Sequence, residues 1–263
     1  MKSSIILSLL IAGASPLLAG EFAQRAVSYD LAGTTFGSTI VWEKEGGDRP
    51  GILMVPNWMG MTEGSLEKAR KVAEMGFVVM MVDMYGVDVR PANASEAGAA
   101  AGAVRGDRTL MRARAGKALE VFRAEQGIPL KSDQVAAIGF CFGGGTVLEL
   151  ARTGADLDAV ISFHGDLISP TLEADSANIN AAVLVLHGAD DPAVPQSDVA
   201  TFIDTMRKTD VDWQLVQFAD TVHSFTNPEA NSPGRSQYNA RSSDRAFEYM
   251  EELLESLWGE SED

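Results

Sequence analysis

The chain has 263 residues, of which 46% are hydrophobic and 22% are charged. This composition is ordinary for a folded protein and excludes a disordered tail or a coiled-coil rod. Acidic residues outnumber basic ones by 37 to 21, so we expect neither a nucleic-acid partner nor binding to an anionic membrane. The single cysteine, Cys141, excludes an intramolecular disulfide and a cysteine-built zinc site. With only three histidines, the chain is poorly provided with metal ligands, and we expect no metal and no cofactor.

The N-terminal sequence MKSSIILSLLIAGASPLLAG has the layout of a secretory signal peptide. Lys2 precedes a short apolar stretch, and Pro16 and small residues follow it. A membrane anchor and a buried first strand are the alternatives, but the apolar stretch is too short to span a bilayer comfortably. We predict that residues 1–20 are removed, leaving a periplasmic or secreted protein without membrane attachment, in which residues 21–263 form a single domain.

After this leader, short apolar runs alternate with longer amphipathic stretches. The predicted strands cover residues 39–43, 51–55, 77–82, 135–140, 158–163, 182–187 and 213–218. The predicted helices cover residues 65–75, 107–126 and about 239–257. This alternation is typical of an α/β fold with a doubly wound, mainly parallel sheet and helices on both faces.

One low-complexity stretch lies between these elements, at residues 92–104. Its alanines favour a helix, whereas Gly98 and Gly102 weaken one. The stretch is either a cap over a site or a simple connection, and the sequence leaves both open.

The segment Gly139-Phe140-Cys141-Phe142-Gly143 follows an apolar strand and precedes a helix-like segment, which is the context of a nucleophile elbow. An elbow holds its nucleophile on a tight turn, and small flanking residues let the strand and the helix approach each other. The helix N-terminus also favours a thiolate. The alternatives are a phosphate-binding loop and a buried structural cysteine, but the glycine spacing does not fit the nucleotide-binding patterns.

Two further segments supply an acid and a histidine. Asp190 and Asp191 follow the strand predicted at residues 182–187, and His223 comes shortly after the last predicted strand. Taken singly, Asp191 could simply belong to an Asp-Pro turn, and His223 could simply be a solvated loop residue. The chain order Cys141, Asp191, His223 is nevertheless the nucleophile, acid, histidine order of the α/β-hydrolases, so together the three predict a catalytic triad.

These residues resemble the dienelactone hydrolase family, a cysteine-dependent branch of the α/β-hydrolases. The resemblance covers roughly residues 35–255, through GILMVPNWMG, VDMYG, GFCFGGG, HGADDPAVP and HSFTNP. It implies an α/β-hydrolase fold with Cys141 as nucleophile, His223 as base and Asp191 as the orienting acid. It favours Asp191 over Asp190 because the family's acid stands four residues before the proline of a Val-Pro pair.

Several positions depart from the family's pattern, and they concern the substrate. Asn57 stands where the family has a glutamate that holds the resting cysteine, and Asn227 stands where an arginine binds the substrate carboxylate. A second carboxylate-binding arginine would fall near Val87, and Arg90 is close enough to replace it. We expect Asn57, Arg90 and His164 to contact the substrate.

The resemblance implies hydrolysis of a small-molecule ester or lactone, and we expect the protein to be a monomer or homodimer. We expect the Cys141 thiolate to attack the carbonyl and water to release the acid from a thioester. The backbone N–H groups of Trp58 and Phe142 are expected to hold the oxyanion. The alternatives are a non-catalytic binding protein on the same scaffold and a thiol-based sensor, although the chain has no second cysteine to resolve a sulfenic acid.

Four arginines form a basic patch in this acidic chain: Arg105, Arg108, Arg112 and Arg114. At helical spacing, Arg108 and Arg112 share one face. The patch either attracts an anionic substrate or pairs with the surrounding acids. His187 ends a predicted strand and is expected to be structural or to face the substrate.

Overall fold

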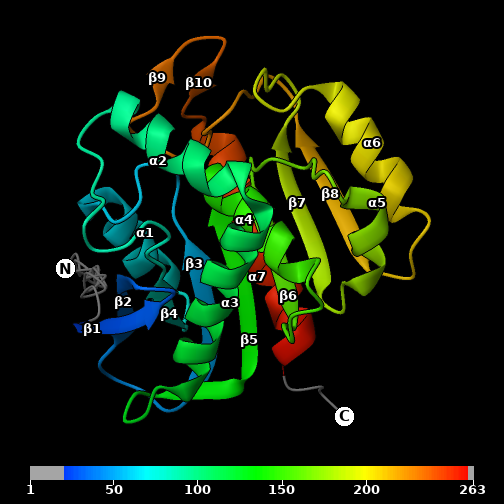
Figure 1. Ribbon diagram of the computed structural model, residues 1–263. Helices are drawn as coiled ribbons and strands as arrows, with labels where there is room; N and C mark the ends of the chain where they lie inside the picture. The colour runs from blue at the N-terminus through cyan, green and yellow to red at the C-terminus, as the bar shows by residue number, and fades with distance from the viewer. Residues whose placement is uncertain (1–20, 260–263) are drawn as a thin grey trace, which may run out of the picture.

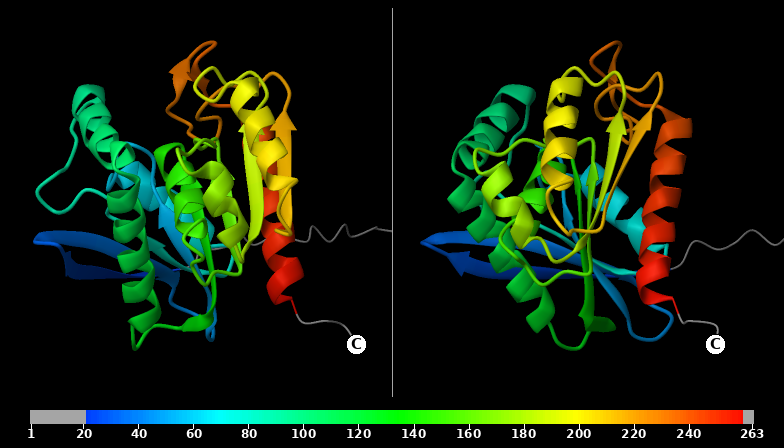
Figure 2. Two further views of the ribbon diagram at one scale, coloured as in Figure 1. Left: turned by 45° about the vertical axis from the view of Figure 1, so that its right-hand side comes forward. Right: turned by 90° about the vertical axis from the view of Figure 1, so that its right-hand side faces the viewer.

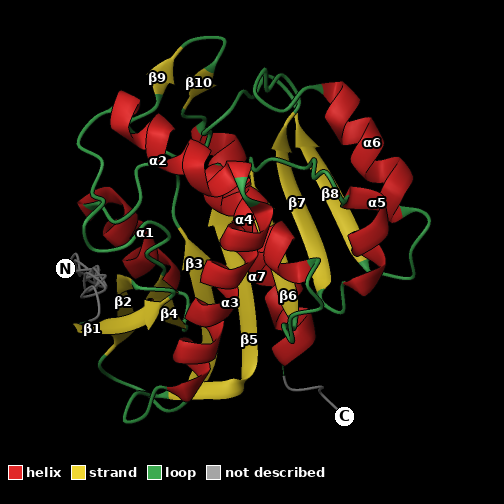
Figure 3. Ribbon diagram, in the orientation of Figure 1, coloured by secondary structure: helices red, strands yellow, loops and turns green. Residues whose placement is uncertain are grey.

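The computed structural model describes residues 21–259, so the predicted signal peptide lies outside the described residues. Its centre is an eight-stranded sheet with helices on both faces (Figures 1 and 3). The strands of this sheet are β1 (Phe22–Leu31), β2 (Thr34–Glu43), β3 (Arg49–Val55), β4 (Val78–Met81), β5 (Leu130–Phe140), β6 (Ala159–Phe163), β7 (Ala182–Gly188) and β8 (Trp213–Phe218). A separate small hairpin consists of β9 (Asn231–Ser232) and β10 (Ser236–Gln237).

The helices are α1 (Glu63–Ala73), α2 (Ala94–Gly106), α3 (Arg108–Ala124), α4 (Phe142–Ala151), α5 (Leu172–Asp175), α6 (Gln196–Met206) and α7 (Ala240–Trp258), with one 3-10 turn, η1 (Ser176–Asn178). None of the helices within residues 21–259 combines the length and the apolar character that crossing a membrane requires.

The strand order is β1-β2-β4-β3-β5-β6-β7-β8. Neighbours from β4 through β8 pair in parallel, whereas β2 runs antiparallel to both β1 and β4. This is the α/β-hydrolase architecture that the sequence predicted. Because the carboxyl ends of parallel strands meet at one edge of the sheet, the loops after β3, β5, β7 and β8 gather there, together with α2 and the β9–β10 hairpin (Figure 1).

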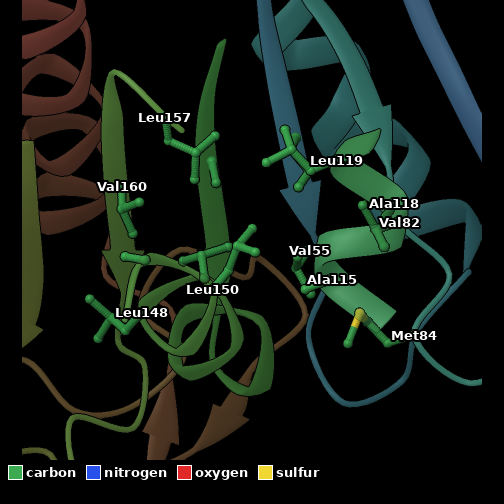
Figure 4. Close-up of a cluster of buried hydrophobic side chains, with 14 of the residues drawn as sticks. Val55, Val82, Met84, Ala115, Ala118, Leu119, Leu148, Leu150, Leu157 and Val160 are labelled. Carbon is green, nitrogen blue, oxygen red and sulfur yellow. The ribbon is translucent and has the colours of Figure 1, made fainter. Parts of the chain in front are cut away.

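Two apolar layers hold the helices on the sheet. Helix α3 lies on one face and α7 on the other, as Figure 2 shows. The small side chains Ala115 and Ala118, with Leu119, bring α3 against Val55 and Val82 (Figure 4). On the opposite face, α7 buries an apolar stripe at helical spacing, formed by Ala246, Phe247, Met250 and Leu254.

The β1–β2 hairpin is the part of the sheet that the sequence analysis missed. Strand β1 was not predicted, and β2 begins at Thr34 rather than at residue 39. The hairpin turns at Ala32 and Gly33, whose φ angles are 50° and 80°, as a type I′ turn requires. Most of β1 is partly or fully exposed, and its sequence alternates between polar and apolar residues. It therefore lacks the continuous apolar run by which the buried parallel strands were predicted.

Candidate active site

Cys141 lies at the turn between β5 and α4, with a φ of 55° that places its backbone in the left-handed region. Its N–H donates to the Phe163 carbonyl at 3.0 Å, which fixes the turn against β6. A Cβ at Gly139 would collide with the Gly143 carbonyl, and a Cβ at Gly143 would collide with the Val55 carbonyl. These positions therefore require glycine, and the close approach of strand and helix directs the Cys141 side chain toward the edge of the sheet.

Asp191 and His223 reach Cys141 from the loops after β7 and β8. His223 Nε2 lies 3.0 Å from Cys141 Sγ, and His223 Nδ1 lies 2.7 Å from Asp191 Oδ2. The other carboxylate oxygen of Asp191 accepts the backbone N–H groups of Ala193 and Val194 at 2.8 and 3.3 Å. Asp191 is buried and held at both oxygens, so it fixes the orientation of the His223 ring.

The electrostatics of this group favour a charged imidazole. Burial lowers the pKa of His223, but its hydrogen bonds to Asp191 and Cys141 and the charges of both outweigh burial and raise that pKa to about 10. Within residues 21–259, no group of three or more His, Cys, Asp or Glu side chains is placed to hold a metal ion.

A cavity of about 650 Å³ opens in front of Cys141 and His223. Helix α2 forms one wall through Gly98, Ala101, Gly102 and Arg105. The alanine-rich stretch at residues 92–104 is therefore largely helical and covers the cavity, and its small residues leave room above Cys141. Asn93 begins this helix by accepting the N–H groups of Ser95 and Glu96, each at 3.1 Å. The β9–β10 hairpin supplies the facing wall through Ser232, Arg235 and Ser236.

The two residues predicted to donate to the oxyanion are Phe142, which follows Cys141 in the chain, and Trp58, which lines the cavity. Phe142 is the first residue of α4, so its N–H has no acceptor within that helix. Trp58 lines the cavity from the loop after β3. Tyr85 supports both residues, since its hydroxyl donates to the Trp58 carbonyl at 2.8 Å and its ring lies 5.6 Å from that of Phe142.

Two arginines make the cavity locally positive although the protein is acidic. Arg105 and Arg235 both line it, and neither makes a salt bridge among the described residues. Asp166 lies at the wall as well, but it pairs with Arg108 at 3.3 Å. Arg112 is used elsewhere, in ion pairs with Glu149 and Asp175 of 2.7 Å each. Of the predicted basic patch, Arg105 alone lines the cavity. Arg235 was not predicted, because it lies in a polar stretch without a motif.

Asn57 and Arg90, which we expected to contact the substrate, do not line this cavity, and their contacts with substrate stay a prediction. The Asn57 side-chain oxygen accepts the N–H of Met59 at 2.9 Å, and Asn57 lines a neighbouring cavity instead. Arg90 donates to the buried carboxylate of Asp83 at 2.8 Å and to the carbonyl of Gly86. These local contacts determine where the two side chains point.

His164 packs against His223 and does not line the cavity, so its predicted contact with the substrate stays a prediction. The two rings meet edge to face with centroids 5.2 Å apart, and His164 Nε2 lies 2.9 Å from Thr226 Oγ1. Burial, and then the charge of His223, holds the pKa of His164 well below its ordinary value, so His164 is neutral beside His223. His187 is likewise buried, at the end of β7, where burial lowers its pKa.

Comparison with known proteins gives the same family as the geometry. Residues 38–257 match the model of the dienelactone hydrolase family. The chain belongs to this family. A solved structure of a dienelactone hydrolase-like promiscuous phosphotriesterase from metagenomic libraries is 36% identical, covers 91% of this chain and 100% of its own, and superimposes with a TM-score of 0.84.

Two curated relatives show how far the similarity reaches. A protein of Escherichia coli K12, provisionally named a carboxymethylenebutenolidase, is 28% identical over 128 residues, which are 46% of this chain and 45% of that protein. A Bradyrhizobium protein named a probable 2-oxo-3-(5-oxofuran-2-ylidene)propanoate lactonase is 25% identical over 189 residues, 68% of this chain and 74% of that protein. The match thus spans less than half the length of the Escherichia coli protein. Family membership identifies the chain as a carboxylic ester hydrolase by class.

Proposed function

We propose that the chain hydrolyses a small ester or lactone through a Cys141–His223–Asp191 triad and a thioester intermediate. The observation that carries this proposal is the hydrogen-bonded line from Asp191 to His223 (2.7 Å) and on to Cys141 (3.0 Å), which ends at a cavity of about 650 Å³. A nucleophile, a base and an orienting acid within hydrogen-bond reach are the parts that acyl transfer requires.

In the proposed first half-reaction, His223 Nε2 takes the thiol proton and the Cys141 sulfur attacks the carbonyl carbon. The carbonyl π electrons move to oxygen, where the N–H groups of Trp58 and Phe142 stabilise the negative charge. The intermediate collapses by breaking the bond to the alcohol oxygen, which takes the proton from His223. The raised pKa of His223 supports this order of steps, because the imidazolium forms readily beside Asp191 and Cys141.

In the second half-reaction, water attacks the thioester while His223 takes one of its protons. The carbon–sulfur bond then breaks, the proton returns to the sulfur, and the carboxylic acid leaves. No oxidant, reductant or metal enters this balance, so the described residues supply every group that it needs.

The substrate we propose carries a negative charge near its scissile carbonyl. Arg105 and Arg235 face the cavity without salt bridges among the described residues, while Trp58 and Val194 supply apolar surface. An anionic ester therefore gains electrostatic attraction that a neutral isostere lacks. The test compares kcat/KM for a carboxylated aryl ester and its methylated analogue in wild type and Arg235→Gln. The proposal expects the preference for the anionic ester to shrink in the variant.

A second candidate function is the hydrolysis of phosphate triesters. It follows from the whole-length similarity to the promiscuous phosphotriesterase, at 36% identity. Attack of the Cys141 sulfur on phosphorus with loss of an aryloxide would use the same triad. A dialkyl aryl phosphate assayed beside the esters tests this candidate directly.

We also propose that residues 1–20 direct export, so that the mature chain is periplasmic or secreted, as a monomer or homodimer. This proposal rests on the sequence of the leader. Expression of the full chain in a Gram-negative host, with mass measurement of the periplasmic product, tests it. A product that retains Met1–Gly20 in the cytoplasm would contradict it.

The main test of the proposed function assays the mature chain and Cys141→Ala with short-chain aryl esters and a cis-dienelactone. Hydrolysis by wild type with loss in the folded variant is the expected result. If neither protein hydrolyses any ester, the non-catalytic binding protein or the thiol sensor becomes the better account.

A further inference from the structure

A second cavity, of about 330 Å³, adjoins the loop after β3, and nothing in the proposed reaction uses it. Neighbouring residues of that loop line the two cavities, since Trp58 lines the first and Asn57 the second. Lys68 of α1 projects into the second cavity's wall, where its Nζ donates to the Thr226 carbonyl at 2.8 Å and to Thr226 Oγ1 at 3.2 Å.

Lys68 lacks a counter-charge. Among the described residues no carboxylate lies within salt-bridge distance of its Nζ, and the favourable neighbour is the face of the Phe140 ring, 4.3 Å away. Burial, and then the charge of Lys71 on the same helix, lowers the pKa of Lys68 to about 7. As an ammonium, Lys68 has three N–H groups, and Thr226 accepts two of them, so within residues 21–259 one N–H is left for a ligand or for solvent.

The same wall presents two side-chain amides whose oxygens are already engaged. Asn57 Oδ1 accepts the N–H of Met59 at 2.9 Å, and Asn227 Oδ1 accepts the N–H of Glu229 at 3.2 Å. Each amide therefore has an NH₂ group that makes no hydrogen bond among the described residues. Together with Lys68, the cavity offers three donors and carries one carboxylate, the exposed Glu229 at its edge.

Four apolar residues of the lining suit a short hydrocarbon chain: Met54, Pro56, Met59 and Phe140. Thr62 and Ser65 also line the cavity, but their hydroxyl groups hydrogen-bond to each other, and that of Ser65 donates to the Gly60 carbonyl. A volume of about 330 Å³ corresponds to roughly ten water molecules at about 30 Å³ each, which limits the occupant to a small molecule. A ligand that matches this wall has an acceptor-rich anionic head and an apolar tail.

We propose that this cavity binds a short-chain monocarboxylate, with its carboxylate against Lys68, Asn57 and Asn227. The carboxylate supplies the missing counter-charge and the missing acceptor, so it stabilises the protonated form of Lys68. The inference does not rest on the proposed function. If that function holds, however, the acid product of ester hydrolysis belongs to the same chemical class as the ligand.

The charged and titratable groups around Lys68 are few. Lys71 lies on its own helix, the neutral His164 faces it through Thr226, and Glu229 stands at the edge of the cavity. Glu229 is exposed and its charge is therefore screened by solvent and salt. A bound anion is thus expected to change mainly the protonation of Lys68.

The test is calorimetric titration of butyrate into the mature chain at pH 8. Iodoacetamide first blocks Cys141, the single cysteine, so that the first cavity cannot take the acid. With a pKa of about 7, Lys68 is roughly nine-tenths neutral at this pH, and binding should protonate it. Titrations in buffers of different ionisation enthalpy should report uptake of close to one proton for each butyrate bound.

Two variants and one control separate binding from folding. Lys68→Met should weaken butyrate binding at least about tenfold and abolish proton uptake, while its thermal unfolding stays cooperative. Asn227→Asp should weaken binding by repulsion without removing the lysine. Lys117→Met, in an ion pair with Glu120 on α3 and outside the lining of the second cavity, should leave both binding and proton uptake unchanged. Unchanged binding in Lys68→Met, or no measurable binding of butyrate to wild type, would overturn the proposal.

Discussion

Replacing Asp191 with asparagine tests the role of the acid most sharply. In wild type, Asp191 Oδ2 accepts the His223 Nδ1 proton at 2.7 Å, which leaves Nε2 free to take the thiol proton. Asp191 Oδ1 accepts two backbone N–H groups, so the amide oxygen of an asparagine will take that place and its NH₂ group will face the imidazole. His223 must then accept at Nδ1 and carry its proton on Nε2, which is the wrong tautomer for a base.

The magnitude follows from the pKa of His223. Its rise from 6.5 to about 10 corresponds to about 5 kcal/mol at about 1.4 kcal/mol for each tenfold change. Asp191 and Cys141 share this stabilisation, so loss of the carboxylate removes roughly half of it, a factor of about 50 to 100. The tautomer change adds roughly another tenfold or more, and we expect kcat/KM to fall about 1,000-fold overall.

The assay is hydrolysis of a short-chain aryl ester by wild type, Asp191→Asn and Asp190→Asn. Asp190 is the matched control because it is the neighbouring carboxylate, exposed and outside the hydrogen bonds to His223. Thermal unfolding checks that both variants are folded. An Asp191→Asn enzyme within tenfold of wild type, or an equal loss in Asp190→Asn, would refute the reasoning.

Three further predictions concern the fold and its dependence on pH. Gly143→Ala should prevent stable folding, because the new Cβ collides with a backbone carbonyl of β3, whereas Gly116→Ala in the open middle of α3 should stabilise by about 0.5–1 kcal/mol; urea unfolding measures both. Glu149→Gln should lower the free energy of unfolding by about 3–5 kcal/mol, because Arg112 and Arg152 lose their buried carboxylate partner. Asp156→Asn, whose side chain is 91% exposed, should change that free energy by less than about 1 kcal/mol. His223 has a raised pKa, so its contribution to stability is complete below pH 6.5 and is lost as the pH approaches 10; the gap in unfolding free energy between wild type and His223→Gln should shrink over that range, and a constant gap would count against the ion pair.

The buried parallel strands could be predicted from the sequence because they are continuous apolar runs. β3, β4, β5, β6 and β7 all lie where such runs stand, and the glycines around Cys141 marked the turn that the structure shows. The β1–β2 hairpin could not be found in this way, since a strand with exposed residues pairs through its backbone and needs only a turn that accepts positive φ.

For the site, the order of residues along the chain carried more information than any single motif. Cys141, Asp191 and His223 were predicted together because parallel strands deliver their loops to one edge of the sheet, and the structure places the three side chains within hydrogen-bond distance. Their catalytic roles remain a prediction. Asn57 and Arg90 show the limit of this reasoning, because each side chain turns to a hydrogen bond within its own neighbourhood, which no spacing in the sequence reveals.

The groups that the sequence did not single out depend on contacts between distant segments. Arg235 reaches the cavity because the β9–β10 hairpin folds over the edge of the sheet toward α2. Lys68 is unusual because Thr226, 158 residues further on, holds its amine where no carboxylate of residues 21–259 lies within salt-bridge distance. In the sequence, Lys68 is an ordinary helical lysine.

The central claim is that Cys141 is the nucleophile of a thioester pathway. The most direct measurement is the intact mass of the protein after rapid mixing with p-nitrophenyl acetate and acid quench, followed by peptide mapping. The account predicts one acetyl group, attached to Cys141 and absent from Cys141→Ala. Rapid ester hydrolysis by Cys141→Ala, or an acetyl group that maps to another residue during turnover, would contradict it.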